Sequence, residues 1–210
     1  MKHILAFGDS NTWGLVPGSE CQERYPQEIR WTGILQNKFK NAGIIEEGLC
    51  GRTTVFEDEQ RPGRKGVALL PAVLETHQPL DAVIIMLGTN DCKSVYNASA
   101  ATIGQGMEMC LDVIEKYISP EKVLLVSPIH LGRDVWREDK DPAFGQLSVE
   151  TCKNLKGIYA KIAKKRGTAF IAASEYAYPS DIDAEHLDEE GHKKLAYAIY
   201  ESLCKIIADD

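Results

Sequence analysis

The 210-residue sequence lacks the features that mark membrane, nucleic-acid-binding and disulfide-rich proteins. No stretch approaches the roughly 18 consecutive apolar residues of a membrane-spanning helix. The N-terminal segment at residues 1–9 is too short and too soon charged for a signal peptide. Basic residues number 24 against 31 acidic ones, too few to bind nucleic-acid phosphates or an anionic membrane. We therefore expect neither a membrane nor a nucleic acid as partner.

Paired cysteines are also lacking. The six cysteines, at positions 21, 50, 92, 110, 152 and 204, form no C-x-x-C pair and no dense framework. Reduced thiols in a cytoplasmic protein are the expectation for such spacing. Apart from Asp183 and His186, no residues have metal-ligand spacing, so we expect no metal and no other cofactor.

The chain shows no repeat, low-complexity tract or Pro/Ser-rich linker, so we expect one domain over residues 1–210. Short apolar runs predict strands at 4–7, 43–46, 81–87, 122–126 and 169–172. Longer amphipathic runs predict helices at 31–40, 68–77, 100–117 and 149–166, and a last one capped by Asp188. This alternation predicts an α/β fold of three layers, with a doubly wound, five-stranded parallel sheet.

Such sheets bind ligands beyond the carboxyl ends of their strands. Ser10 follows the first predicted strand, and Asp183 and His186 lie between the fifth strand and the last helix. Acyl transfer by a serine needs an imidazole to take its proton and a carboxylate to orient that imidazole. Because Asp183 and His186 are three residues apart, one turn of chain can supply both groups.

A transition state of acyl transfer also needs hydrogen-bond donors for its oxyanion. Gly51 follows the second strand, and its backbone N–H can approach a ligand closely. Asn90 follows the third strand and offers a side-chain amide, and the backbone N–H of Ser10 is the third donor. Each signal alone is typical of a turn or a helix cap. Their joint occurrence at successive strand ends favours a catalytic site.

These blocks resemble those of the SGNH (GDSL-type) hydrolases, which implies a flavodoxin-like fold. The matching blocks are Gly8-Asp9-Ser10, the glycine of the G-L-C-G-R-T-T run at Gly51, the G-T-N-D run at Asn90, and Asp183 with His186. By this resemblance Ser10 is the nucleophile of a triad with Asp183 and His186. Ser10, Gly51 and Asn90 form its oxyanion hole.

Further matching runs, G-D-S-N-T-W-G, R-W-T-G and I-I-M-L-G-T-N-D, resemble the aryl-esterase/acyltransferase branch. Members of that branch act on small acyl esters, and several are homo-oligomers, so we expect a homo-oligomer here. The sequence has Asn11 where leucine is usual, which we interpret as a change in pocket polarity. We expect Asn11, Trp13 and His130 to contact substrate.

Other residues near the predicted strand ends have less specific interpretations. We expect Arg52 to hold its loop through a carboxylate and His192 to be exposed on the last helix. The loop 133–145 carries Trp136 and Phe144 among charged residues. It is interpreted as a lid, a pocket rim, a subunit contact or simply an anchored mobile loop.

The leading hypothesis is a serine esterase that hydrolyses small short-chain carboxylic esters, or transfers their acyl group, through an acyl-Ser10 intermediate. A carbohydrate O-deacetylase with the same triad is an alternative that the polarity of Asn11 favours weakly. A binding module with a vestigial site is a third hypothesis. The intact set of Ser10, Gly51, Asn90, Asp183 and His186 is evidence against it.

Overall fold

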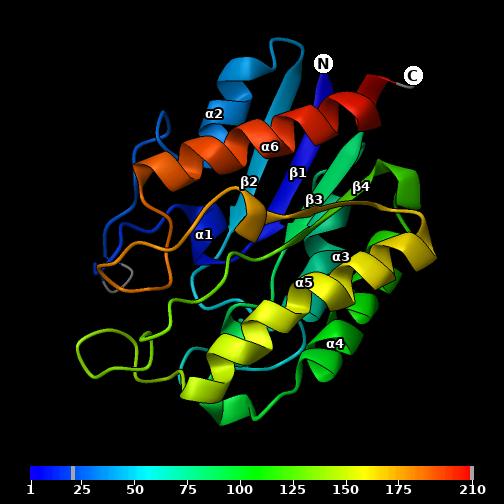
Figure 1. Ribbon diagram of the computed structural model, residues 1–210. Coiled ribbons are helices and arrows are strands. Elements are labelled where there is room, and N and C mark those ends of the chain that lie inside the picture. The colour runs from blue at the N-terminus through cyan, green and yellow to red at the C-terminus, as the bar shows by residue number, and fades with distance from the viewer. Residues whose placement is uncertain (20–21, 209–210) are drawn as a thin grey trace.

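The computed structural model describes residues 1–19 and 22–208. Its centre is a five-stranded sheet in the order β2-β1-β3-β4-β5, with every neighbouring pair parallel (Figure 1). The strands are β1 (Lys2–Gly8), β2 (Ala42–Gly48), β3 (Ala82–Met86), β4 (Val123–Ser127) and β5 (Ala169–Ala172). The predicted α/β fold with a five-stranded, doubly wound parallel sheet is confirmed.

Helices cover both faces of the sheet and make the three expected layers (Figure 1). The helices are α1 (Ser10–Trp13), α2 (Trp31–Lys38), α3 (Gly66–Thr76), α4 (Ala100–Ile114), α5 (Gln146–Arg166) and α6 (Glu189–Ala208). Single 3₁₀ turns are η1 (Asn90–Cys92), η2 (Ser94–Tyr96), η3 (Pro120–Lys122) and η4 (Ala173–Glu175). Among the described residues, no helix has the length and apolar character needed to cross a membrane.

Side chains that alternate along the strands build two separate cores. In β1, Leu5 and Phe7 pack with α3, α4 and α5, whereas Ile4 and Ala6 pack with α2 and α6. Every residue of β3 is buried, as its uninterrupted apolar run predicts for a strand covered on both faces. Burial on both sides fixes the register of the strands, and therefore the height at which each one ends.

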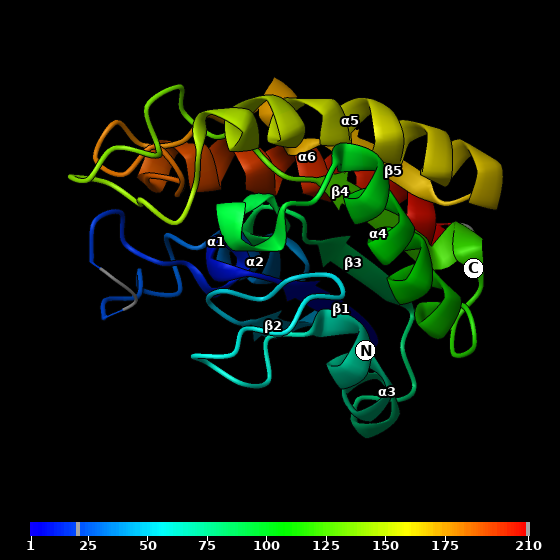
Figure 2. The ribbon, with the colours of Figure 1, turned by 90° about the horizontal axis from the view of Figure 1, so that it is seen from below.

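The strand order places the ends of β1, β2 and β3 together. Gly8 at the end of β1 is in register with Gly48 of β2 and Met86 of β3. The chain passes from β2 across β1 to β3, so the order reverses around β1, which is the usual position of a ligand site in such sheets. Figure 2 shows the loops that follow the strands gathered at one end of the sheet, away from both termini.

Helix ends depart from the sequence-based boundaries by a few residues. The helix expected at 149–166 begins three residues earlier, at Gln146, because Ser148 Oγ accepts a hydrogen bond of 2.9 Å from the Gly145 N–H. The last helix begins at Glu189, and Asp188 Oδ1 accepts from the Gly191 N–H at 2.7 Å, which confirms Asp188 as its cap. The four-residue α1 was not predicted.

Candidate active site

Ser10 is held at the first turn after β1. The Asp9 carboxylate accepts a hydrogen bond of 3.0 Å from the Asn11 N–H and so caps the four-residue helix α1. Gly14 ends this helix in the left-handed conformation, with its N–H donating to the Ser10 carbonyl. At Gly8 a side chain is excluded, since a Cβ there would lie 2.0 Å from Thr12 Oγ1. The short turn therefore fixes Ser10 at the switch point of the sheet.

The structure brings the three expected triad residues into one chain of contacts. Ser10 Oγ lies 2.9 Å from His186 Nε2, and His186 Nδ1 lies 2.8 Å from Asp183 Oδ2. The other oxygen, Asp183 Oδ1, accepts from the backbone N–H groups of Glu185 and His186 at 3.0 and 2.9 Å. One carboxylate thus orients the imidazole and also closes the turn that carries it.

The segment 183–187 is fixed by contacts with the segments around Gly132 and Gly18. Ala184 has a φ of +61°, and its carbonyl accepts from the Gly132 N–H at 2.8 Å. Asp183 Oδ2 also accepts from the Gly18 N–H at 3.0 Å, from the segment that follows α1. A non-glycine residue in this conformation costs about 1–2 kcal/mol and persists only where its surroundings enforce it. The backbone here is therefore built to hold His186 in place.

Asn11 contributes to the same support and not to the pocket wall. Its Oδ1 accepts from the Leu187 N–H at 2.9 Å, and its Nδ2 donates to the Glu185 carbonyl at 3.4 Å. The side chain is buried between α1 and the segment that carries His186. The change from the usual leucine therefore joins the nucleophile turn to the imidazole turn.

The other two expected oxyanion-hole residues, Gly51 and Asn90, line the same pocket as Ser10. Gly51 has a φ of +83°, a conformation that favours glycine, and a Cβ there would meet the Arg61 guanidinium at 2.2 Å. Asn90 begins η1, and its Nδ2 donates one hydrogen bond of 3.1 Å to the Arg52 carbonyl. A side-chain amide has two donor hydrogens, so Asn90 keeps a second one for another acceptor.

Buried polar contacts join the loop of Gly51 to its neighbours. Arg52 donates to the carbonyls of Gly8, at 2.8 Å, and Glu47. It thus holds the loop as expected, but through carbonyl groups and not through a carboxylate. The Asp91 carboxylate accepts from the Thr54 backbone N–H and hydroxyl, which ties this loop to η1, the turn that carries Asn90.

These groups surround a pocket of about 300 Å³. Its lining is Ser10, Leu15, Gly18, Gly51, Arg61, Asn90, Lys93, Lys140, Asp141, Asp183, Glu185 and His186. Lys140 and Asp141 come from the loop 133–145, which therefore forms a pocket rim. Asn11, Trp13 and His130 are not among the lining residues, although substrate contact was expected of them. Sequence reasoning missed the charged residues Arg61, Lys93 and Glu185, which no motif marks.

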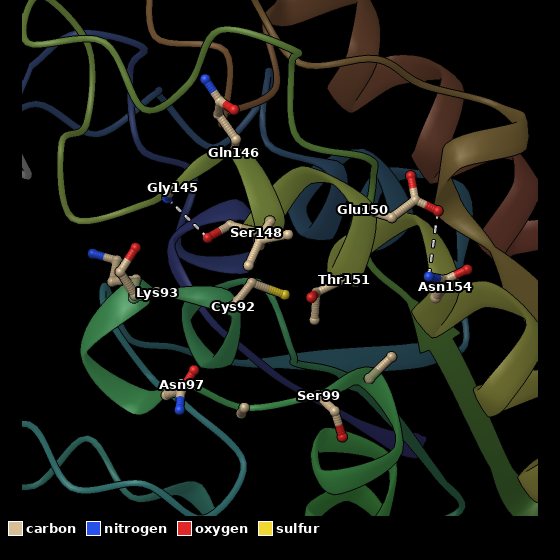
Figure 3. Close-up of a pocket in the computed structure, with 14 residues that line it drawn as sticks. Cys92, Lys93, Asn97, Ser99, Gly145, Gln146, Ser148, Glu150, Thr151 and Asn154 are labelled. Atoms are coloured by element: carbon tan, nitrogen blue, oxygen red, sulfur yellow. Dashed lines mark hydrogen bonds between the residues drawn. The ribbon is translucent and has the colours of Figure 1, made fainter.

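A larger hollow, of about 600 Å³, lies between η1, η2 and the first turns of α5 (Figure 3). Lys93 lines both hollows. Ser94, Ser99 and Ser148 face it, but its described lining contains no histidine to activate a serine. Size therefore does not identify the site, whereas convergent acid–base groups do.

The charges around His186 set its proton affinity. Burial by itself lowers the pKa of His186, yet the carboxylates of Glu185, Asp183 and Asp9 raise it to about 9. Burial raises the pKa of Asp183, but the hydrogen bond and charge of His186 outweigh this and bring it to about 2. In the described part of the chain, no cluster of three histidine, cysteine or acidic residues could hold a metal ion.

Comparison with known proteins decides the family. The model of the GDSL-like lipase/acylhydrolase family matches residues 6–194. The chain belongs to this family. No match was found among curated protein sequences. A carbohydrate acetylesterase from Sinorhizobium meliloti shares 34% identity and a TM-score of 0.88 over 98% of this chain and 100% of that one. An aryl esterase of M. smegmatis shares 31% identity and a TM-score of 0.86 over the same shares.

Family membership, together with these relatives, makes this GDSL-like protein a carboxylic ester hydrolase of the serine type. The expected SGNH resemblance is thereby confirmed. The family's four blocks lie at the carboxyl ends of the strands, where the pocket has formed.

One expectation about a histidine of this GDSL-like hydrolase is wrong. His192 was expected on the surface, but it is 0% exposed in the first turn of α6. Its Nδ1 accepts from the Trp31 N–H at 3.4 Å, and the Tyr25 ring meets it edge-on at 5.5 Å. Burial lowers the pKa of His192 to about 4. Its spacing of three and seven residues from the buried Leu195 and Ile199 was the sequence signal of an inward position.

Proposed function

We propose that the protein hydrolyses small, short-chain carboxylic esters with Ser10 as nucleophile, His186 as general base and Asp183 as its orienting carboxylate. The observation that carries the proposal is the pair of contacts, 2.9 Å from Ser10 Oγ to His186 Nε2 and 2.8 Å from Nδ1 to Asp183. Both distances allow direct proton transfer or orientation. The resemblance of the family blocks supports the same assignment.

The reaction has two halves. Ser10 Oγ forms a bond to the ester carbonyl carbon while its proton passes to His186 Nε2. The tetrahedral intermediate collapses, the bond to the alcohol oxygen breaks, and Nε2 returns the proton to that oxygen. Water then attacks acyl-Ser10, giving its proton to Nε2, and Ser10 leaves with that proton as the carboxylic acid forms. If a second alcohol replaces water, the same steps transfer the acyl group.

In both halves the negative charge gathers on the former carbonyl oxygen. The backbone N–H groups of Ser10 and Gly51 and the second amide hydrogen of Asn90 are the proposed donors for it. Loss of one such donor costs about 10²–10³ in kcat in serine hydrolases. Arg52 and Asp91 act on this hole indirectly, because they fix the loops that carry Gly51 and Asn90.

The second candidate is O-deacetylation of a carbohydrate by the same triad. The pocket favours it because Lys93, Asp141 and Glu185 surround the catalytic groups with hydrogen-bonding side chains. An aryl alcohol gains little from such a lining, whereas an alcohol with several hydroxyls finds partners there. The non-catalytic alternative has no observation in its favour.

The test is covalent labelling by a fluorophosphonate together with release of acetate from 4-nitrophenyl acetate. Ser10→Ala is expected to lose labelling and at least about 10³-fold in kcat/KM. Ser94→Ala is the matched control, since Ser94 is an exposed serine of the larger hollow. It should label and turn over as the wild type does. Persistent labelling or turnover in Ser10→Ala would refute the assignment, and an unlabelled wild type would favour the binding module.

The wider setting is also a proposal. Cys92, Cys110, Cys152 and Cys204 form no disulfide, which supports an enzyme of the reducing cytoplasm. Val95 and Leu147 are 80% and 82% exposed beside the larger hollow, which supports contact between copies in a homo-oligomer. A net charge of -7 supports the absence of a nucleic-acid partner. Sedimentation of wild type and Leu147→Glu tests the oligomer.

A further inference from the structure

Glu185 is a carboxylate inside the pocket that the proposed reaction does not use. It lies between the two triad residues Asp183 and His186, it is 4% exposed, and it lines the pocket with Ser10. Its backbone is held at both ends: the N–H donates to Asp183 Oδ1 at 3.0 Å, and the carbonyl accepts from Asn11 at 3.4 Å. The side chain therefore enters the pocket from a rigid segment.

The Glu185 carboxylate has unused hydrogen-bonding capacity. The nearest cationic partner among the described residues is His186, whose Nε2 lies 3.8 Å from Oε1, beyond hydrogen-bond distance. No described group donates a hydrogen bond to this carboxylate, in contrast to Asp183, which accepts four. The Glu185 oxygens are not sealed in the interior but face the pocket, so a ligand bound there can supply the missing donor.

The reaction geometry places the alcohol part of the substrate next to Glu185. His186 Nε2 must return a proton to the alcohol oxygen, so that oxygen comes within about 3 Å of Nε2. Glu185 Oε1 is 3.8 Å from the same nitrogen. A hydroxyl on the carbon next to the esterified one is therefore within reach of the carboxylate, whereas the carbonyl oxygen of the ester faces the oxyanion donors.

The charge of the pocket favours a hydroxyl over an ammonium as the donor. Arg61, Lys93 and Lys140 line the same pocket and repel a second cation. Lys93 lies 3.3 Å from Asp141 and Lys140 lies 3.0 Å from Asp134, so both lysines form ion pairs with carboxylates other than Glu185. A neutral hydroxyl can donate to Glu185 without opposing those charges.

We propose that Glu185 is a specificity-determining residue that accepts a hydrogen bond from a hydroxyl adjacent to the ester oxygen. The preferred substrates are then monoesters of vicinal diols, the arrangement found in acetylated sugars and glycerol. This inference rests on the proposed function, because it uses His186 as the proton donor to the alcohol. It deepens that function by assigning selection of the alcohol to one residue.

The test compares two esters of equal size, 2-hydroxyethyl acetate and n-propyl acetate, which differ by a hydroxyl in place of a methyl group. The wild type is expected to prefer the hydroxy ester at least about tenfold in kcat/KM, the usual effect of a hydrogen bond to a charged group. Glu185→Leu removes the acceptor and should abolish the preference, with n-propyl acetate hydrolysed at least as fast as by wild type. Glu185→Gln, which is isosteric, should show an intermediate preference.

Glu189→Gln is the control, because it removes one negative charge from an exposed position four residues away. It should keep the wild-type preference. A second readout is the pH profile with n-propyl acetate. The groups that face His186 are Asp183, Glu185 and Asp9, and removal of the Glu185 charge should move the acidic limb to lower pH. If Glu185 had a purely structural role, its substitution would lower kcat/KM equally for both esters and would leave the acidic limb of the pH profile in place.

Equal turnover of both esters by the wild type, or a preference that survives in Glu185→Leu, would overturn the proposal. The same outcomes leave the catalytic assignment intact as long as Ser10→Ala no longer hydrolyses either ester. Turnover retained in Ser10→Ala would instead overturn the proposed function. If Glu185→Leu does not fold, the comparison of Glu185→Gln with Glu189→Gln still decides, since neither change alters side-chain volume.

Discussion

His186 and His192 are both buried, on either side of the start of α6, yet burial has opposite results for them. Three carboxylates raise the pKa of His186 to about 9 against the effect of burial. At His192 only the Asp188 carboxylate opposes burial, and the pKa of His192 falls to about 4. The carboxylate neighbours of His186 thus stabilise the imidazolium that forms when it takes the Ser10 proton, whereas His192 packs as a neutral core side chain. The charged groups around each histidine, more than its burial, distinguish the proposed base His186 from the core residue His192.

The largest expected effect comes from truncation of each imidazole in turn. His186→Ala removes the base, and kcat/KM on 4-nitrophenyl acetate should fall by at least about 10³-fold. His192→Asn, which keeps an acceptor for the Trp31 N–H, should change kcat/KM less than about threefold at pH 8, because the residue touches no pocket group. Steady-state rates on both variants measure this. A large loss of kcat/KM in His192→Asn would contradict the proposed difference between the two histidines.

The next effect is on stability, and its sign follows from the lowered pKa of His192. The group takes up a proton in the unfolded chain below its ordinary pKa of 6.5, whereas the folded protein resists protonation down to about 4. Stability contributed by neutral His192 is therefore complete above pH 6.5 and is lost as the pH falls towards 4, by about 3 kcal/mol at pH 4. Urea unfolding at pH 7 and pH 4 measures the loss.

Wild type minus His192→Asn isolates this contribution, because carboxylates that titrate in the same range are common to both proteins. The variant should be less stable at pH 7 and should lose less on acidification. If both proteins lose the same free energy of unfolding between pH 7 and pH 4, His192 is protonated in the folded state. The two histidines would then differ far less than their surroundings imply.

The sequence predicted the sheet and the contacts among Ser10, Asp183 and His186 because both depend on short, strongly patterned segments. Each strand is an apolar run, and Asp183 and His186 are close enough in sequence for one turn to join them to Ser10. The direction of the side chains after Ser10 was not predictable. Residues 10–13 form a single helical turn, too short for any periodicity, which points Asn11 at the His186 segment. Trp13 consequently lies outside the pocket lining.

The charged residues of the pocket could not be predicted from the sequence for a related reason. Arg61, Lys93 and Lys140 come from loops or short turns, where charged residues are usually solvated, and only the tertiary fold places them around Ser10. Glu185 lies inside the D-x-x-H block itself, at a position to which the motif assigns no role. The error at His192 is the opposite one, because a buried residue was expected to be exposed. Its helical spacing indicated an inward position, but its neighbours in the sequence are charged.

The smallest effect concerns Asp188, which lies between the two histidines and caps α6. Its Oδ1 accepts from the Gly191 N–H at 2.7 Å, so Asp188→Ala should lower the free energy of unfolding by about 1 kcal/mol. Asp188→Asn retains a capping oxygen and removes only the charge, which favours protonated His192. It should therefore lose little stability at pH 7. Both variants should keep wild-type kcat/KM, because the turn around His186 is fixed by Asp183 and Asn11 and not by the helix cap. Reduced turnover in Asp188→Ala would mean that the start of α6 also positions the His186 imidazole. The surroundings of His186 and His192 would then be coupled and not independent.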